Sequence, residues 1–193
     1  MNPLTDTPIA SFVSQEAFRS WINDHYTEPK GIWMRIYKKD SGVTSITYQE
    51  ALEVALCYGW IDGQKLSFDE TSWLQKYTPR RPRSGWSKIN REKVAHLIKV
   101  GLMQPPGLAE VEKARTDGRL NAAYDPQSTA TIPEDFQAAL TTAPAAQAFF
   151  ATLSKTNRYA ILYRIQTAKK PETREKRIRL FIEMLVKGET LHP

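Results

Sequence analysis

Apolar residues in the first part of the chain change between helical and strand-like spacing. After Ser14 they recur three and four positions apart, which predicts a helix over 15–25 with Ser14 as its N-cap. Residues 31–38 are mostly β-branched and aromatic, which predicts a strand. Thr47 and Glu50 have the spacing of a capping box, so a second helix should begin directly after Thr47.

Two further strands are predicted after Gly59, which ends the second helix. Residues 64–68 and 72–77 are separated by a connection short enough for a β-hairpin. With the strand at 31–38 they make a small antiparallel sheet. This sheet needs helices packed against it, because three strands alone are marginally stable.

From Ser87 onward the pattern is almost entirely helical, and Gly101 is suited to end the first of these helices. Further helices are predicted to start at Pro105, at Pro133 in the N1 position, at Pro144, after the cap Ser154 and at Pro171. The fold class is therefore α+β, with a small antiparallel sheet and helices in the N-terminal half and a helical C-terminal half. We expect an α+β region over 1–120, a polar, turn-rich connector over 121–132, and a helical region over 133–193 that packs on the first.

One short pattern, S-K-x-N-R, occurs at 87–91 and again at 154–158. In each copy we expect the serine to cap a helix and the asparagine, at N3, to bond back toward the cap. Five residues are too few to indicate duplication, so the pattern is interpreted as two well-capped helices.

The composition excludes several classes of protein. The chain has 193 residues, enough to bury a core without disulfide or metal staples. Its single cysteine, Cys57, lies in an apolar run and is predicted to be a buried small hydrophobe. No stretch approaches the roughly 20 apolar residues of a membrane span, and residues 1–12 lack a signal-peptide pattern. We expect a cytoplasmic protein, and the sequence does not determine its oligomeric state.

The net charge of +6 is unevenly distributed. Residues 76–99 carry a balance of +7, residues 155–187 carry another +7, and the rest of the chain is therefore acidic, at −8. Such asymmetry is compatible with an anionic partner. Within the second segment, residues 174–179 alternate with apolar positions and are interpreted as the solvated face of an amphipathic helix. A nucleic-acid or partner surface is the alternative.

Familiar catalytic patterns are missing from the sequence. It has no phosphate-binding loop, no dinucleotide-binding motif and no nucleophile elbow, and its three histidines are far apart. We therefore predict no metal and no cofactor. Asp62, in the G-W-I-D-G motif at 59–63, has two open interpretations. It is either part of a turn, because Asp-Gly favours turns, or a functional carboxylate.

The strongest functional signal lies in residues 77–91. Pro79 and Pro82 should hold the segment extended, its arginines offer planar bidentate donors, and Trp86 offers a flat stacking surface. Ser87 begins a helix whose free N–H groups and dipole favour an anion. The candidate ligand-binding residues are Trp60, Asp62, Arg80, Arg81, Arg83, Trp86, Ser87 and Asn90. The alternative is a solvated basic loop with the tryptophan packed in the core.

Several motifs, in this order, resemble one bacterial family. They are G-W-I-D-G at 59–63, T-P-R-x-P-x-S-x-W-S-x-x-N at 78–90, Gly-Leu-Met at 101–103, Pro-Gly-Leu at 106–108, Ala-Ala-Tyr-Asp at 122–125, and Ser-Lys-x-Asn-Arg-Tyr with Thr-Arg-x-x-Arg-Ile near the end. Together they resemble the YdeI/OmpD-associated proteins, also labelled bacteriocin-protection or bacteriocin-resistance proteins, from about Phe12 to His192. The resemblance implies a link to antimicrobial stress resistance and no agreed catalytic residues.

Three functions follow from these observations. The first is binding of an anionic, phosphate-bearing small molecule at residues 80–90. The second is nucleic-acid binding through both basic segments. The third is an enzyme in which Asp62 is the general base and the arginines stabilise an oxyanion. Whether the protein is an enzyme stays open, and the family label also permits a protein-interaction role in stress tolerance.

Overall fold

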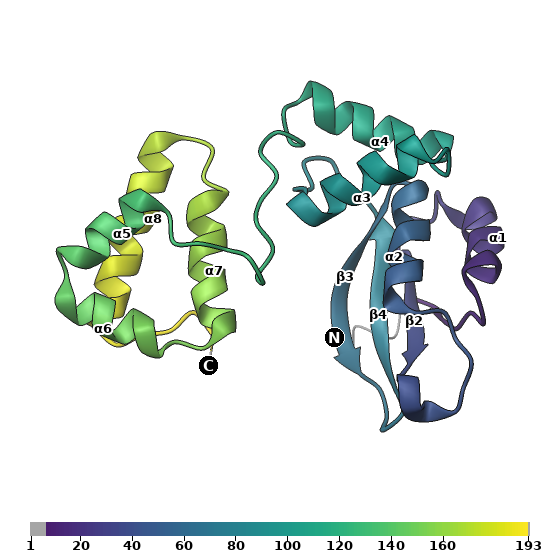
Figure 1. Ribbon diagram of the computed structural model, residues 1–193, viewed down its shortest axis with the longest axis horizontal. Coiled ribbons are helices and arrows are strands. Elements are labelled where there is room, and N and C mark those ends of the chain that lie inside the picture. The colour runs from purple at the N-terminus through teal and green to yellow at the C-terminus, as the bar shows by residue number, and fades with distance from the viewer. Residues whose placement is uncertain (1–6, 193) are drawn as a thin grey trace. The chain divides into compact units, whose positions relative to one another are not determined.

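The computed structural model describes residues 7–192, and its α+β fold agrees with the sequence prediction. The chain divides into two compact units. The first comprises the residues up to Gly85 together with Asn90–Asn121, and it contains the sheet. The second comprises Trp86–Ile89 and the residues from Ala122 onward, and it is helical (Figure 1).

The sheet of the first unit has the strand order β1-β2-β4-β3. Strand β4 (Ser72–Pro79) is antiparallel to both of its neighbours, β2 (Ile32–Tyr37) and β3 (Trp60–Ser67), as predicted. The sheet as a whole is mixed, because β1 (Ile9–Ala10) runs parallel to β2. A strand of two residues is too short to leave a periodic pattern, so the sequence did not reveal it.

Helices α1 (Gln15–His25) and α2 (Tyr48–Cys57) pack against one face of this sheet (Figure 1). Both start at the predicted caps. The hydroxyl of Ser14 accepts the Ala17 N–H, and Thr47 forms a complete capping box. A short 3₁₀ helix, Lys39–Ser41, follows β2.

Glycine allows helices α2 and α4 (Pro105–Thr116) to approach closely. A Cβ atom on Gly107 would lie 2.1 Å from the carbonyl oxygen of Cys57, a distance that only glycine tolerates. Cys57 itself is fully buried, as predicted.

Helix α3 (Lys88–Lys99) precedes α4. Gly101 follows α3 with φ of +71°, as a C-terminal stop requires.

The second unit contains α5 (Glu134–Thr141), α6 (Pro144–Thr152), α7 (Lys155–Gln166) and α8 (Pro171–Val186). Pro133 is the N-cap of α5 and not its N1 residue, a shift of one position from the prediction. The core of this unit consists largely of the buried side chains of Phe136, Leu140, Phe150, Ile161, Ile165, Phe181 and Leu185.

The contacts of the second S-K-x-N-R copy agree with the prediction only in part. Ser154 caps α7 by accepting the Asn157 N–H, as predicted. The Asn157 amide does not bond back to the cap, since it donates to the His192 carbonyl and accepts the His192 N–H. Near the first copy, Ser87 pairs with Tyr124 in a parallel β-bridge, so an extended contact precedes α3.

Across residues 7–192, none of the helices combines the length and the apolar character that crossing a membrane demands.

Candidate functional site: an arginine-bearing turn

The pairing of β3 with β4 brings two sequence motifs together. Trp60 lies opposite Pro79 and Asp62 lies opposite Tyr77 in the ladder. The pairing extends one residue further, because the Arg80 N–H donates to the Gly59 carbonyl at 3.0 Å. The G-W-I-D-G stretch is therefore adjacent to the start of the arginine-rich segment.

Two buried arginines fix the backbone of that segment. Arg80 is only 7 % exposed, and its Nη1 donates to the Gly85 carbonyl at 3.1 Å. Arg119 is 8 % exposed, and its Nη1 donates to the Ser84 carbonyl at 3.0 Å while its Nε binds the Asp117 carboxylate. Arg80 therefore holds the loop from within and does not present its guanidinium to solvent.

Residues 81–84 form a turn, and the prediction that this segment is extended was wrong. The Ser84 N–H donates to the Arg81 carbonyl at 3.0 Å, and Arg83 has φ of +70°. A proline at the second position and a positive φ at the third are features of a type II turn. Pro82 fixes only its own φ, so its ring is compatible with this turn as well as with extended backbone.

Arg83 occupies a backbone conformation that normally belongs to glycine. An L-residue in the left-handed region costs roughly 1–2 kcal/mol because its Cβ crowds the following carbonyl. The bonds from Arg80 and Arg119 to the next two carbonyls stabilise this conformation. Strain that the surroundings maintain in this way is a recognised mark of functional positions.

Arg81 and Arg83 are the exposed cations of this turn. Within residues 7–192, neither has an ion pair or a side-chain hydrogen bond to another residue. Each guanidinium therefore keeps its planar set of donors for an external anion.

Both tryptophans among the candidate residues are buried. Trp60 is 1 % exposed, and its indole Nε1 donates to the Tyr26 carbonyl at 2.7 Å. Trp86 is 2 % exposed, and its carbonyl accepts the Tyr124 N–H. Neither ring offers an open face for stacking, which corresponds to the alternative of tryptophan packed in the core.

The start of α3 is also partly occupied. Helix α3 begins at Lys88, whose N–H donates to the Tyr124 carbonyl at 2.9 Å and is thus not available to a ligand. The ammonium of Lys88 forms an ion pair with Asp125 at 2.5 Å. Ser87 lies in the bridge to Tyr124, and Asn90 is buried. These contacts favour a structural role for the start of the helix.

Asp62 lies within β3, so the turn interpretation of this residue was wrong. Its Oδ2 accepts a hydrogen bond of 2.8 Å from the Tyr48 hydroxyl. Burial, followed by the negative charge of Asp62, raises the pKa of Tyr48 well above its ordinary value. Tyr48 is therefore a neutral donor at physiological pH. A role of Asp62 as general base stays a prediction.

Two family models match the chain, one in each part. Residues 10–110 match the model described as "Domain of unknown function (DUF8412)". Residues 129–188 match the model described as "Bacteriocin-protection, YdeI or OmpD-Associated". The chain belongs to the DUF8412 family, whose model covers about half of it, and its C-terminal part is similar to the YdeI/OmpD-associated family. No curated protein and no solved structure matches the chain.

The YdeI/OmpD-associated match is narrower than the resemblance expected from about Phe12 to His192. It covers the Ser-Lys-x-Asn-Arg-Tyr motif at 154–159, whereas the G-W-I-D-G motif falls within the DUF8412 match. The arginine-bearing turn at 81–84 also lies in the DUF8412 region. The two family descriptions therefore concern different parts of the molecule.

Several arginines of the second basic segment, in the YdeI/OmpD-associated region, are engaged inside their own unit. Arg174 binds the Asp135 carboxylate with Nε and Nη2 and donates to the Ile165 carbonyl. Arg177 donates to the Arg164 carbonyl, and Arg158 to the carbonyls of residues 150 and 151. The +7 balance of this segment thus overstates the charge that an external partner can reach.

Sequence reasoning did not find Arg119, although it positions the candidate site. Arg119 lies 35 residues from the carbonyl it binds, and no local pattern connects them. The turn itself left a signal, since proline followed by a residue able to adopt positive φ is typical of type II turns. Arginine at that third position concealed it.

Proposed function

We propose that this protein binds a phosphate-bearing anion through Arg81 and Arg83. The observation that carries the proposal is the turn geometry. Arg83 is held at φ of +70° while buried Arg80 and Arg119 bind the carbonyls that follow it. These contacts support the idea that the turn has its binding conformation before a ligand arrives. Less conformational entropy is then lost on binding.

The chemistry of the two exposed side chains suits phosphate. Guanidinium groups match phosphate oxygens bidentately, and each charge-assisted hydrogen bond contributes roughly 1.5–3 kcal/mol. The surrounding segment carries +7, which attracts anions over a distance of about one Debye length. Of the candidate ligand-binding residues predicted from the sequence, the proposal keeps Arg81 and Arg83 as ligand contacts. Arg80 becomes a residue that positions them.

The proposal is tested by calorimetric titration with ATP and with tripolyphosphate at low ionic strength. We expect Arg83→Gly to weaken binding by about tenfold or more, because it removes the guanidinium while glycine keeps the turn at no steric cost. The same variant should unfold at an unchanged or higher temperature. Arg179→Gln, which removes one cation from the second unit, is the charge-matched control and should bind normally.

Equal binding by the wild type and by an Arg81→Gln/Arg83→Gly double variant would overturn this proposal. A loss of binding that accompanies general unfolding would not support it, and the melting temperature distinguishes the two cases.

Nucleic-acid binding is the second candidate, because Arg81 and Arg83 project from an exposed turn that a polymer can reach. Duplex binding should weaken with salt by a log–log slope of about −0.9 per phosphate contact. Arg83→Gly should then reduce the slope by about one unit. A slope that this variant leaves unchanged would exclude the turn from a nucleic-acid interface.

The description of the C-terminal family suggests protection against bacteriocins, and we propose that role only at the level of the cell. A strain that lacks the protein should become more sensitive to bacteriocin, and the wild-type chain should restore resistance. Complementation with Arg83→Gly would show whether anion binding contributes. Unaltered sensitivity of the deletion strain would remove the protective role.

A further inference from the structure

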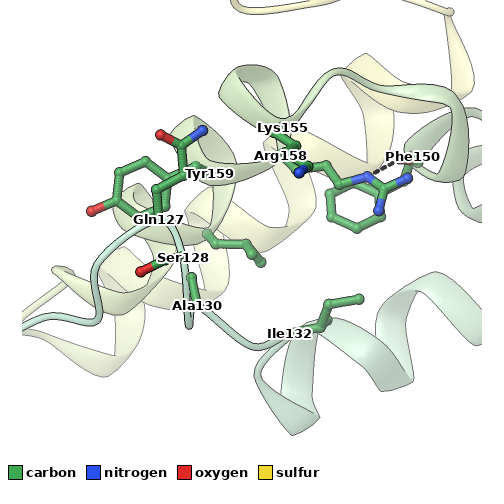
Figure 2. A pocket seen from close by; sticks show the side chains of 9 residues that line it. Gln127, Ser128, Ala130, Ile132, Phe150, Lys155, Arg158 and Tyr159 are labelled. Carbon is green, nitrogen blue, oxygen red and sulfur yellow. Dashed lines mark hydrogen bonds between the residues drawn. The ribbon is translucent and has the colours of Figure 1, made fainter. Parts of the chain in front are cut away.

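A cavity of about 250 Å³ lies within the second unit (Figure 2). One wall comes from helix α7, a second from the end of α6, and a third from the stretch Gln127–Ile132 that precedes α5. None of the residues proposed above for phosphate binding lines it. Its volume is below the ~300–1,000 Å³ of pockets for drug-sized ligands, so it suits a smaller molecule.

One part of the cavity wall is apolar. The side chains of Ala130, Ile132, Phe150 and Leu162 line it together with the ring of Tyr159. The Tyr159 hydroxyl donates to the Asp125 carbonyl at 3.1 Å, which fixes the position of the ring. Burial raises the pKa of Tyr159 to about 12, so this hydroxyl stays a neutral donor at physiological pH. The wall therefore suits the apolar body of a ligand.

The charged groups of the lining are all cationic. Lys155 and Arg158 lie on the same side of the cavity, three residues apart in the first turn of α7, and the lining contains no carboxylate. Gln127 and Ser128 add neutral hydrogen-bonding groups on the other side (Figure 2). An anionic group is thus the charge that this lining would favour.

The two cations are not equally available. Arg158 donates through Nε to the Phe150 carbonyl at 3.2 Å and through Nη2 to the Ala151 carbonyl, and its guanidinium lies 5.7 Å from the Phe150 ring centroid. Within the described range 7–192, Lys155 has no ion pair and no side-chain hydrogen bond. Lys155 is therefore the group able to reach a ligand, and it supplies one point charge.

We propose that this cavity binds a small monocarboxylate with an aromatic or compact aliphatic body. The carboxylate pairs with Lys155, and the body lies against Phe150, Leu162 and Ile132. A free phosphate suits the site less well, because Arg158 is committed to two carbonyls and the apolar wall would remain uncovered. This site is distinct from the arginine-bearing turn and does not depend on it.

The test is calorimetric or NMR titration of the full chain with four probes: benzoate, cyclohexanecarboxylate, benzyl alcohol and inorganic phosphate. We expect the two carboxylates to bind, and we expect benzyl alcohol and phosphate to bind at least about tenfold more weakly, since a charge-assisted bond or the apolar contact is then missing. Perturbed resonances should include those of Lys155 and Ile132.

Two variants locate the binding. Lys155→Met keeps the apolar stem and removes the charge, and should weaken benzoate binding by about tenfold. Ala130→Leu fills the cavity and should weaken benzoate binding by excluding the ring of the ligand. Lys169→Met is the charge-matched control and should bind as the wild type does, and Arg83→Gly should leave benzoate binding unchanged.

Benzoate binding that survives both Lys155→Met and Ala130→Leu would overturn the proposal, as would the absence of binding by either carboxylate. Phosphate binding as tight as benzoate would also overturn it, because the apolar wall would then contribute nothing. If one of the two variants does not fold, the other decides the outcome.

Discussion

Arginine has two different roles within a few positions of this chain. Arg80 and Arg119 are buried and bind backbone carbonyls, whereas Arg81 and Arg83 are exposed on the turn that those bonds hold. Composition and charge counts cannot separate the two roles, because all four residues carry the same charge. What separates them is where the tertiary structure places each side chain, buried against the loop or exposed on the turn.

A second polar cluster, around Asp69, leads to a prediction on pH dependence. The carboxylate accepts hydrogen bonds from the Ser72 hydroxyl at 2.7 Å and from the Thr71 N–H at 2.9 Å, and it pairs with Arg35 at 2.6 Å. These bonds, that from Ser72 above all, hold the pKa of Asp69 at about 2. The folded-state pKa lies below the unfolded value of about 3.9, so folding favours the ionised form.

The stability from Asp69 should be fully present above about pH 4 and lost as the pH falls through about 2. Asp69→Asn should therefore be less stable than the wild type at pH 6, and the difference should shrink between pH 4 and pH 2. Urea unfolding of both proteins at a series of pH values measures this difference in stability. Glu70→Gln, at the neighbouring exposed position, serves as the control. A difference that is constant with pH would contradict the prediction.

At the level of elements, the helix ends were the most predictable feature. Ser14, Thr47 and Ser154 each cap the helix expected of them, because a cap depends on three or four consecutive residues. Strand β3 was longer than predicted and begins at Trp60. Its first residues are in the strand because they pair with β4. The sequence pattern around Trp60 holds no information on that distant partner.

The contact between α2 and α4 leads to a prediction on stability. Gly107→Ala should destabilise the protein by about 2 kcal/mol or more, because the added methyl would meet the Cys57 carbonyl and force the helices apart. This loss should exceed the roughly 1 kcal/mol that alanine gains over glycine in helix propensity. Chemical denaturation of both proteins, with equal m-values, measures this change in the free energy of unfolding.

Ala109→Ser, on an exposed position of α4, is the control and should change stability by about 0.5 kcal/mol at most. If Gly107→Ala were neutral or stabilising, the close approach of the two helices would not be rigid.

At the level of the whole molecule, each unit has a core of its own. The first unit contains the buried residues of α1, α2 and the sheet, and the second contains the cluster around Phe136, Phe150 and Phe181. Chain order does not separate them completely, since Trp86–Ile89 belongs to the second unit while the residues on either side belong to the first. We propose that each core unfolds as a separate cooperative unit.

The tryptophans allow a test of this proposal. Of the five tryptophans, Trp21, Trp33, Trp60 and Trp73 lie in the first unit, so fluorescence reports mainly on that unit. Phe181→Ala should destabilise the second unit by about 3–5 kcal/mol and leave the fluorescence transition in place. Ile22→Ala should shift the fluorescence transition. A common shift of the fluorescence and far-ultraviolet transitions in both variants would show a single cooperative unit.

The sequence by itself determined the α+β class, most helix boundaries, the burial of Cys57 and the location of the strongest concentration of positive charge. These features depend on residues that are close together in the chain. The tertiary structure decided that Asp62 lies in a strand, that both candidate tryptophans are buried, and that Arg81 and Arg83 are the exposed arginines of the candidate set. Those outcomes depend on partners such as Tyr48, Pro79 and Arg119, and a local pattern carries no information on which distant group a side chain will meet.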